Sequence, residues 1–194
     1  GSRSSEKVAL TFHGAGDPTL ASALLKIFRE TSTPVTVFAV GTFLKANPSF
    51  AKEIVDAGHD LGNHTMTHTQ MKTISAKSVD QEISQCAELL NKLIGNHGSF
   101  FRPSGTQFSN ALIRKSAKKF GYQNCISYDV DSKDYLDPGK EAVISNVTNG
   151  AKSGSIISLH FGHKNTVAAM PSIIENLNTK GLKPVTLTEL INTK

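Results

Sequence analysis

The stretch VALTFHGAGDPTLASALLKIF, at residues 8–28, decides the fold. Residues 8–12 are apolar or β-branched, as in a buried strand. After a short polar loop, Leu20, Leu24 and Ile27 recur at the spacing of one helix face. The stretch therefore predicts a strand, a loop and a helix in direct succession.

The same alternation recurs along the chain. Further strand candidates lie at 35–40, 59–63, 100–101, 124–128, 155–160 and 184–187, and helical spacing returns around 50–55, 79–93 and 112–120. Alternating strands and helices predict parallel strands joined by right-handed crossovers. We expect an α/β fold, a distorted or incomplete (β/α) barrel of about seven parallel strands, with an open doubly wound sheet as the alternative. No glycine-rich phosphate loop follows a strand, which argues against a nucleotide-binding fold.

Length and composition indicate a single domain. The chain has 194 residues, and its 38% hydrophobic and 19% charged residues are typical of a globular protein rather than a disordered one. Residues 1–6 are interpreted as a tail that opens with the cloning remnant Gly1-Ser2. One domain is expected over residues 7–194, because no linker or low-complexity tract interrupts them.

Charge and apolar patterning restrict the partners. The formal net charge of +5 favours acidic partners, but the lysines are dispersed, and the absence of Trp leaves little aromatic surface for stacking bases. Nucleic-acid binding is therefore not expected. No apolar run reaches the length of about 18 residues that a membrane span needs. Cys86 and Cys125 are interpreted as small core residues.

Polar side chains stand where most of the predicted strands end. They are His13 and Asp17, His64 and His68, Arg102, Asp129, Asp131 and Asp134, and His160 and His163. The carboxyl ends of barrel strands are where catalytic residues gather. His64 and His68 are four residues apart and share one face if the segment turns helically, a spacing that suits one divalent metal. Asp129, next to Val130, is the residue that this pattern leaves open, because it can point to the opposite face.

The order of these residues resembles the polysaccharide deacetylases, carbohydrate esterase family four, over nearly the whole chain. The matching segments are VALTFHGAGDP at 8–18, HTMTH at 64–68, FFRPSG at 100–105, DSKDYLDP at 131–138 and SLH at 158–160. The resemblance implies a deacetylase-like catalytic domain over 7–194 and the hydrolysis of N-acetyl or O-acetyl groups on a glycan.

The resemblance also implies a role for each matched residue. His64 and His68 would bind a divalent metal, with zinc expected, and Arg102 would orient the residue at the base position. His160 would be the general acid that protonates the leaving amine, held by Asp134 or, as the lesser alternative, Asp131. Tyr135 and Leu159 would line the pocket for the acetyl methyl group.

The first motif departs from the family pattern. Where the family has two adjacent aspartates, one the base and one a metal ligand, this chain has His13 and Gly14. A glycine has no side chain with which to bind metal, so weak or absent metal binding is one expectation. His13, Asp17 and His163 are the available substitutes, and His13 is alternatively the base itself. Asp17 is also the expected N-cap of the helix that begins near Thr19.

Three functions follow as hypotheses. The first is a metal-dependent deacetylase of an extracellular or cell-wall glycan, such as peptidoglycan or a chitin-like oligomer. The second is a catalytically impaired glycan-binding pseudoenzyme on the same fold, which Gly14 favours. The third is an amidase for a non-carbohydrate amide, because the same metal chemistry acts on any accessible planar amide.

Overall fold

The computed structural model describes residues 1–192. Its internal contacts divide the chain into two compact units. The first unit combines residues 1–36 with residues from 128 onward, and the second unit consists of residues 37–127. Each unit is described by itself.

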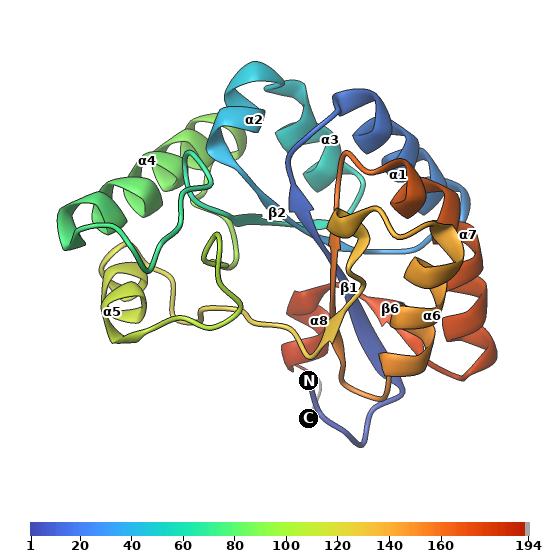
Figure 1. Ribbon diagram of the computed structural model, residues 1–194. Coiled ribbons are helices and arrows are strands. Elements are labelled where there is room, and N and C mark those ends of the chain that lie inside the picture. Colours follow the sequence, from blue (N-terminus) through green and yellow to red (C-terminus); the bar gives the residue numbers. More distant parts are fainter. Residues whose placement is uncertain (193–194) are drawn as a thin grey trace. The chain divides into compact units, whose positions relative to one another are not determined.

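The first unit is built on parallel strands. They are β1 (Lys7–Gly14), β4 (Val130–Asp131), β5 (Ile156–His160) and β6 (Lys183–Val185). β1 lies between β5 and β6, and β4 pairs with the other edge of β5 (Figure 1). The register places His13 opposite His160, so the two histidines lie at the carboxyl ends of neighbouring strands.

Helices cover the strands of the first unit. They are α1 (Pro18–Glu30), the 3-10 helix η1 (Asp134–Leu136), α6 (Lys140–Gly150), α7 (Lys164–Thr179) and α8 (Leu187–Asn192). α7 packs against both α6 and α1, as Figure 1 shows. Val8, Leu10 and Phe12 of β1 are fully buried, and so are Ala9 and Thr11 between them, which accounts for the apolar and β-branched residues of this strand.

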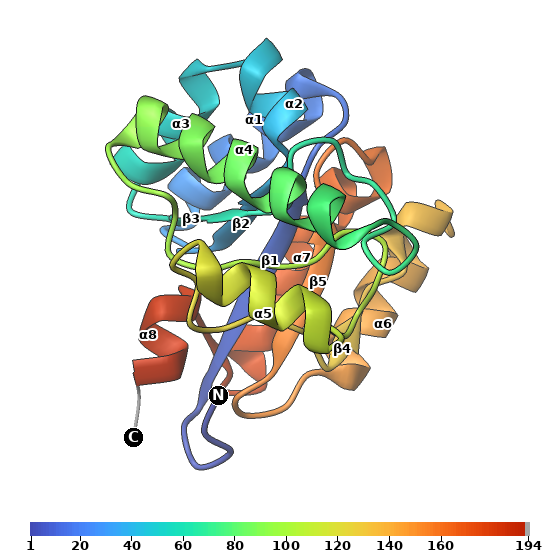
Figure 2. The ribbon, with the colours of Figure 1, turned by 90° about the vertical axis from the view of Figure 1, so that its left-hand side faces the viewer.

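The second unit has the same alternation. Its elements are β2 (Thr36–Ala39), α2 (Gly41–Ala46), α3 (Ser49–Asp56), β3 (Asp60–Asn63), α4 (Ala76–Ile94) and α5 (Ala111–Lys119). The first residue of β2, Thr36, is the last residue of the segment 1–36 that belongs to the first unit. β3 pairs with β2, and parallel bridges extend the order from Asn63 to Phe101 and from Phe101 to Cys125. α4 and α5 pack side by side, as in Figure 2, around a core that includes Ile83 and Ile113.

The predicted α/β class with parallel strands is confirmed, and two strand predictions are reduced to single bridges. Residues 100–101 pair only at Phe101, because Pro103 follows and has no N–H to donate to a ladder. Residues 124–128 pair only at Cys125. The carbonyls of Ile126 and Ser127 accept hydrogen bonds from the Arg102 guanidinium instead of a neighbouring strand.

Two long helices, α6 and α7, were not among the sequence predictions. α6 buries few apolar side chains, chiefly Val143 and Val147, so its periodicity is weak. α7 carries Pro171 in its interior, a residue that usually ends a helix. Its apolar face is nevertheless buried against α6 and α1, and this packing outweighs the local cost.

The cysteines lie where the sequence predicts. Cys86 is fully buried, and burial raises the pKa of its thiol to about 12, so it behaves as a small apolar side chain. Cys125 is partly buried against a core cluster of the second unit. Within residues 1–192, no helix combines the length and the apolar character required to cross a membrane.

Gly62 is the position where β3 leaves no room for a side chain. A Cβ there would lie 2.8 Å from the Phe100 carbonyl oxygen and 2.9 Å from the Phe38 ring. We expect Gly62→Ala to lower the free energy of unfolding by about 1–3 kcal/mol, the usual cost of overpacking a core. Urea unfolding measures this, and a midpoint equal to that of the wild-type protein would contradict the packing of β3 described here.

Candidate active site

The first unit contains a hydrogen-bonded histidine–aspartate pair at the end of β5. Asp134, in η1, is fully buried, and its Oδ1 lies 2.7 Å from Nδ1 of His160. Because a carboxylate accepts hydrogen bonds, Nδ1 carries the proton and Nε2 is the nitrogen that His160 can use in chemistry. This pairing selects Asp134 between the two aspartates considered for that position.

Two further groups satisfy the other oxygen of Asp134. Its Oδ2 accepts from the backbone N–H of His160 at 2.8 Å and from the Thr166 hydroxyl at 2.6 Å. Burial alone would raise the pKa of Asp134, but the hydrogen bonds from His160 and Thr166 outweigh it and hold the pKa below its usual value. The carboxylate is therefore ionised and accepts the hydrogen bond from Nδ1 of His160.

His13 lies beside this pair. Its ring stacks on the His160 ring with 4.3 Å between centroids, and its Nε2 lies 3.0 Å from the Ser158 hydroxyl. Both contacts follow from the register of β1 and β5, which aligns His13 with His160 and places Ser158 two residues earlier on the same strand. Gly14, the next residue of β1, is buried.

Other predicted site residues surround His160. The Tyr135 ring lies edge-on to it at 5.3 Å and is 47% exposed, so the tyrosine borders the solvent side. The His163 ring lies 5.9 Å from the His160 ring. Asp131 is linked to His160 through Tyr135, because its carboxylate accepts hydrogen bonds from the Tyr135 hydroxyl and the Lys133 N–H.

Three more residues of the first unit have defined places. Leu159 is fully buried in β5. Asp17 is the N-cap of α1, as predicted, and its carboxylate accepts from the Thr19 N–H at 2.8 Å. Asp129 bonds to Arg3 and to the backbone of Ile156, which is an ordinary structural role.

In the second unit, His64 and His68 lie with their ring centroids 5.0 Å apart. His64 is fully buried, and its Nδ1 lies 2.8 Å from the backbone carbonyl of Arg102. A carbonyl only accepts, so Nδ1 is the donor and Nε2 is the nitrogen with which this ring can bind metal. Metal-binding histidines usually donate the hydrogen of their other ring nitrogen to such a carbonyl, which fixes the orientation of the imidazole.

The His64–His68 segment is not helical, although the four-residue spacing was expected to place both histidines on one face only if the segment turned as a helix. Thr65 and His68 both have positive φ angles, 71° and 61°, a conformation that costs free energy in a β-branched residue. Hydrogen bonds hold the turn: the Thr65 N–H donates to the Asn63 side chain at 2.8 Å, and the Thr65 hydroxyl donates to Ser104 at 3.0 Å. This turn, rather than a helix face, brings the two imidazoles together.

Arg102 is buried, with 1% of its surface exposed. Its guanidinium lies 4.2 Å from the centre of the Phe38 ring and donates to the carbonyls of Ile126 and Ser127. A cation so enclosed is held in one orientation, which suits the positioning role that the third motif implies.

Sequence reasoning missed three supporting residues. Ser158 contacts His13, Thr166 bonds to Asp134, and Asn63 holds the Thr65 turn. Ser158 is a polar residue inside the apolar strand IISLH, and that interruption was the available signal. Thr166 and Asn63 carry no comparable signal, because threonine and asparagine in such positions are common caps and turn residues.

The first unit has a buried aspartate–histidine pair at a strand end, and the second unit has a turn that holds two imidazoles together, which are groups suited to proton transfer and to binding a divalent metal. The sequence profile described as polysaccharide deacetylase matches residues 1–125 of this chain. The chain therefore belongs to the polysaccharide deacetylase family, as the resemblance implied.

Individual relatives agree with this assignment. A peptidoglycan-N-acetylglucosamine deacetylase of Bacillus cereus is 33% identical over 191 residues, which cover 96% of this chain and 89% of the relative. Among solved structures, a pseudoenzyme of carbohydrate esterase family four from Bacillus anthracis superposes with a TM-score of 0.92 at 27% identity, covering 99% of this chain and 67% of the other. A mutant of that pseudoenzyme with restored enzymatic activity superposes with a TM-score of 0.92 at 28% identity, covering 99% and 70%.

Proposed function

We propose that this protein is a metal-dependent hydrolase that removes N-acetyl or O-acetyl groups from a cell-wall or extracellular polysaccharide, with residues 7–194 as the catalytic domain. The observation that carries the proposal is the Asp134–His160 pair. A buried ionised carboxylate that fixes the protonated nitrogen of a histidine at a strand end is an arrangement for proton transfer.

His160 acts in this proposal as the general acid. Asp134 accepts the hydrogen bond from Nδ1 of His160 and fixes the orientation of the ring, so Nε2 is the nitrogen that delivers a proton to the leaving amine. Tyr135 and Leu159 border the acetyl group, in keeping with the position of Tyr135 beside the His160 ring. Arg102 orients the residue at the base position, and Asp131 positions Tyr135 through its hydroxyl.

His64 and His68 are proposed as metal ligands. The fixed tautomer of His64 fits this role, and imidazole pairs suit zinc. A divalent metal bound there would polarise the acetamide carbonyl and lower the pKa of a bound water. The protein's own contribution is to hold both imidazoles in the turn that Thr65 shapes.

His13 is the substitute that we favour for the missing third ligand. The carboxylate of Asp17 already caps α1, and the ring of His163 faces His160. His13 stands in the first motif, directly before the glycine that replaces the family's ligand. Three imidazoles form a known catalytic zinc set. One histidine cannot be both ligand and base, so His13 as the base is the alternative. Metal titration of His13→Gln decides between them, because the variant should bind metal more weakly only if His13 is a ligand.

The relatives support an acetylated glycan as the substrate. Two of them are named for action on peptidoglycan and on chitooligosaccharides, which share N-acetylated sugar units. We extend this substrate class, and with it an extracellular or cell-wall location, to the present chain.

A second candidate is a glycan-binding pseudoenzyme. Gly14 cannot bind metal through a side chain, and a pseudoenzyme of the same family has the same fold over nearly the whole chain. A mutant of that pseudoenzyme has restored enzymatic activity, so loss of catalysis on this fold is reversible by mutation in that relative.

Titration with zinc and cobalt separates the two candidates. We expect one-to-one binding that His64→Ala weakens by more than about 100-fold, since removing a ligand costs more than disturbing its hydrogen-bond partner. His97→Ala is the matched control, because His97 is an exposed histidine of the same unit. Equal affinity of His64→Ala and the wild-type protein, or no binding at millimolar metal, would reject the proposed ligands.

Acetate release from acetylated chitin or peptidoglycan fragments tests the chemistry. We expect His160→Ala to lower the rate about 10²–10⁴-fold, the usual contribution of a general acid. Glycan binding without acetate release in the wild-type protein would instead establish the pseudoenzyme.

A further inference from the structure

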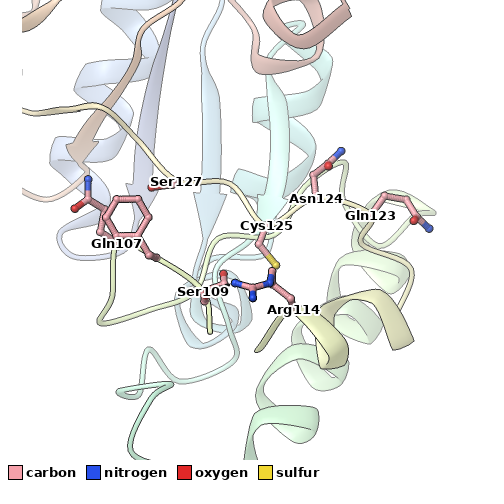
Figure 3. Close-up of a pocket in the computed structure, with 8 residues that line it drawn as sticks. Gln107, Ser109, Arg114, Gln123, Asn124, Cys125 and Ser127 are labelled. Atoms are coloured by element: carbon pink, nitrogen blue, oxygen red, sulfur yellow. Dashed lines mark hydrogen bonds between the residues drawn. The ribbon is translucent and has the colours of Figure 1, made fainter. Parts of the chain in front are cut away.

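The second unit contains a pocket of about 420 Å³ that no proposed catalytic residue lines. It lies between the loop that precedes α5, the first turns of α5 and the segment that follows α5 (Figure 3). Its lining includes Gln107, Phe108, Ser109, Arg114, Gln123 and Asn124. The volume falls within the range of small-molecule sites, about 300–1,000 Å³.

An exposed aromatic ring borders this pocket. Phe108 is 61% exposed, so a large apolar surface remains in contact with water. Exposing it gains nothing for folding, since burial of a phenylalanine side chain is worth about 1.5–3 kcal/mol. A flat ring at the edge of a pocket is suited to stacking against the apolar face of a ring-shaped ligand.

The remaining lining is dominated by neutral polar groups. Gln123 and Asn124 are exposed, and Ser109 is half-buried. Amides and hydroxyls both donate and accept hydrogen bonds, as the hydroxyl and acetamido groups of a sugar require. An aromatic face combined with amide side chains therefore favours a saccharide over an apolar ligand.

Arg114 adds a positive charge. Its guanidinium, next to Ser109 and Cys125 in Figure 3, donates to the Ser109 carbonyl. No carboxylate of residues 1–192 pairs with it, and none of the described residues that line the pocket is acidic. Lys119, at the other end of α5, differs because Asp80 neutralises it. An arginine side chain in this setting fits a carboxylate, which it can bind through two parallel hydrogen bonds.

We propose that this pocket binds a carboxylate-bearing sugar unit, with the sugar ring against Phe108 and the carboxylate on Arg114. The site is separate from the proposed deacetylation chemistry, since neither His64, His68 nor His160 takes part. It gives the domain a hold on an acidic glycan that does not depend on metal or turnover.

N-Acetylmuramic acid and N-acetylglucosamine form a matched pair of probes, because they differ by one carboxylate-bearing ether group. Binding is followed by NMR through the side-chain amide signals of Gln123 and Asn124. We expect the wild-type protein to bind the acidic sugar about tenfold more tightly than the neutral one, the effect of one charge-assisted hydrogen bond. Arg114→Gln removes this difference, and Phe108→Ala weakens binding of both sugars.

Lys118→Gln is the matched control, because it removes the same charge from an exposed position of the same helix without touching the pocket. Arg114→Lys provides a second variant if Arg114→Gln fails to fold, and it is expected to bind the acidic sugar with intermediate affinity. Equal binding of the two sugars to the wild-type protein, or tighter binding of adenosine monophosphate at the same amide signals, would overturn the proposal. These signals report on the pocket even if acetate release is never observed, so the two proposals fail separately.

Discussion

Gly14→Asp is expected to raise the zinc affinity by at least about 10–100-fold, because it supplies the carboxylate ligand that the first motif lacks. Gly14 is the last residue of β1 and is not among the glycines with positive φ, so the backbone accepts any L-residue there. The position is buried. An unneutralised carboxylate at this place is costly, and the metal-free variant should be less stable than the wild-type protein.

Thermal unfolding with and without zinc measures this effect without any substrate. We expect zinc to raise the melting temperature of Gly14→Asp more than that of the wild-type protein, because a ligand that binds the folded state more tightly stabilises it more. Gly14→Asn is the matched control, since it has the same size but no charge. If zinc shifts both variants equally, the side chain at position 14 does not reach the metal, and the expected gain from a carboxylate there is contradicted.

Asp134→Ala is expected to lower the free energy of unfolding at pH 7 by about 3 kcal/mol or more, because it leaves buried donors without their charged acceptor. The donors are the His160 ring and backbone N–H and the Thr166 hydroxyl. Urea unfolding measures the loss. Glu141→Ala, an exposed carboxylate on α6, should stay within about 0.5 kcal/mol of the wild-type protein. Equal stability of Asp134→Ala and Glu141→Ala would contradict the pairing with His160.

The pH dependence of this effect has a definite sign. The folded-state pKa of Asp134 is lowered, so its contribution is fully present above the unfolded-state pKa of about 3.9 and is lost as pH falls toward the folded-state value. The stability difference between the wild-type protein and Asp134→Asn should therefore be constant from neutral pH down to about pH 4 and shrink below it. A difference that instead disappears between pH 7 and 5 would assign the effect to a histidine.

The spacing of apolar and capping residues along the chain predicted the structure correctly where a single short segment determines it. The apolar run of β1, the helical spacing of α1 and the Asp17 cap are all local features, and the structure has each of them. Pattern was less informative where tertiary packing overrides local preference. Helix α7 continues past Pro171. Residues 124–128 do not form a continuous strand, and two of their carbonyls accept hydrogen bonds from Arg102.

The sequence by itself determined the parallel α/β class, the family and the candidate site residues. The alternation of strands with helices and the spacing of the motifs can both be recognised in the amino-acid sequence. Only the tertiary structure decided how these residues are held. It selected Asp134 over Asp131 as the partner of His160, and it brought His64 and His68 together in a turn with positive φ angles rather than on a helix face. The physical reason is that side-chain hydrogen bonds hold these residues, such as that from the Thr166 hydroxyl to Asp134 and that from the Thr65 N–H to the Asn63 side chain. The local conformational preference of a residue does not specify which partner its side chain will bond to.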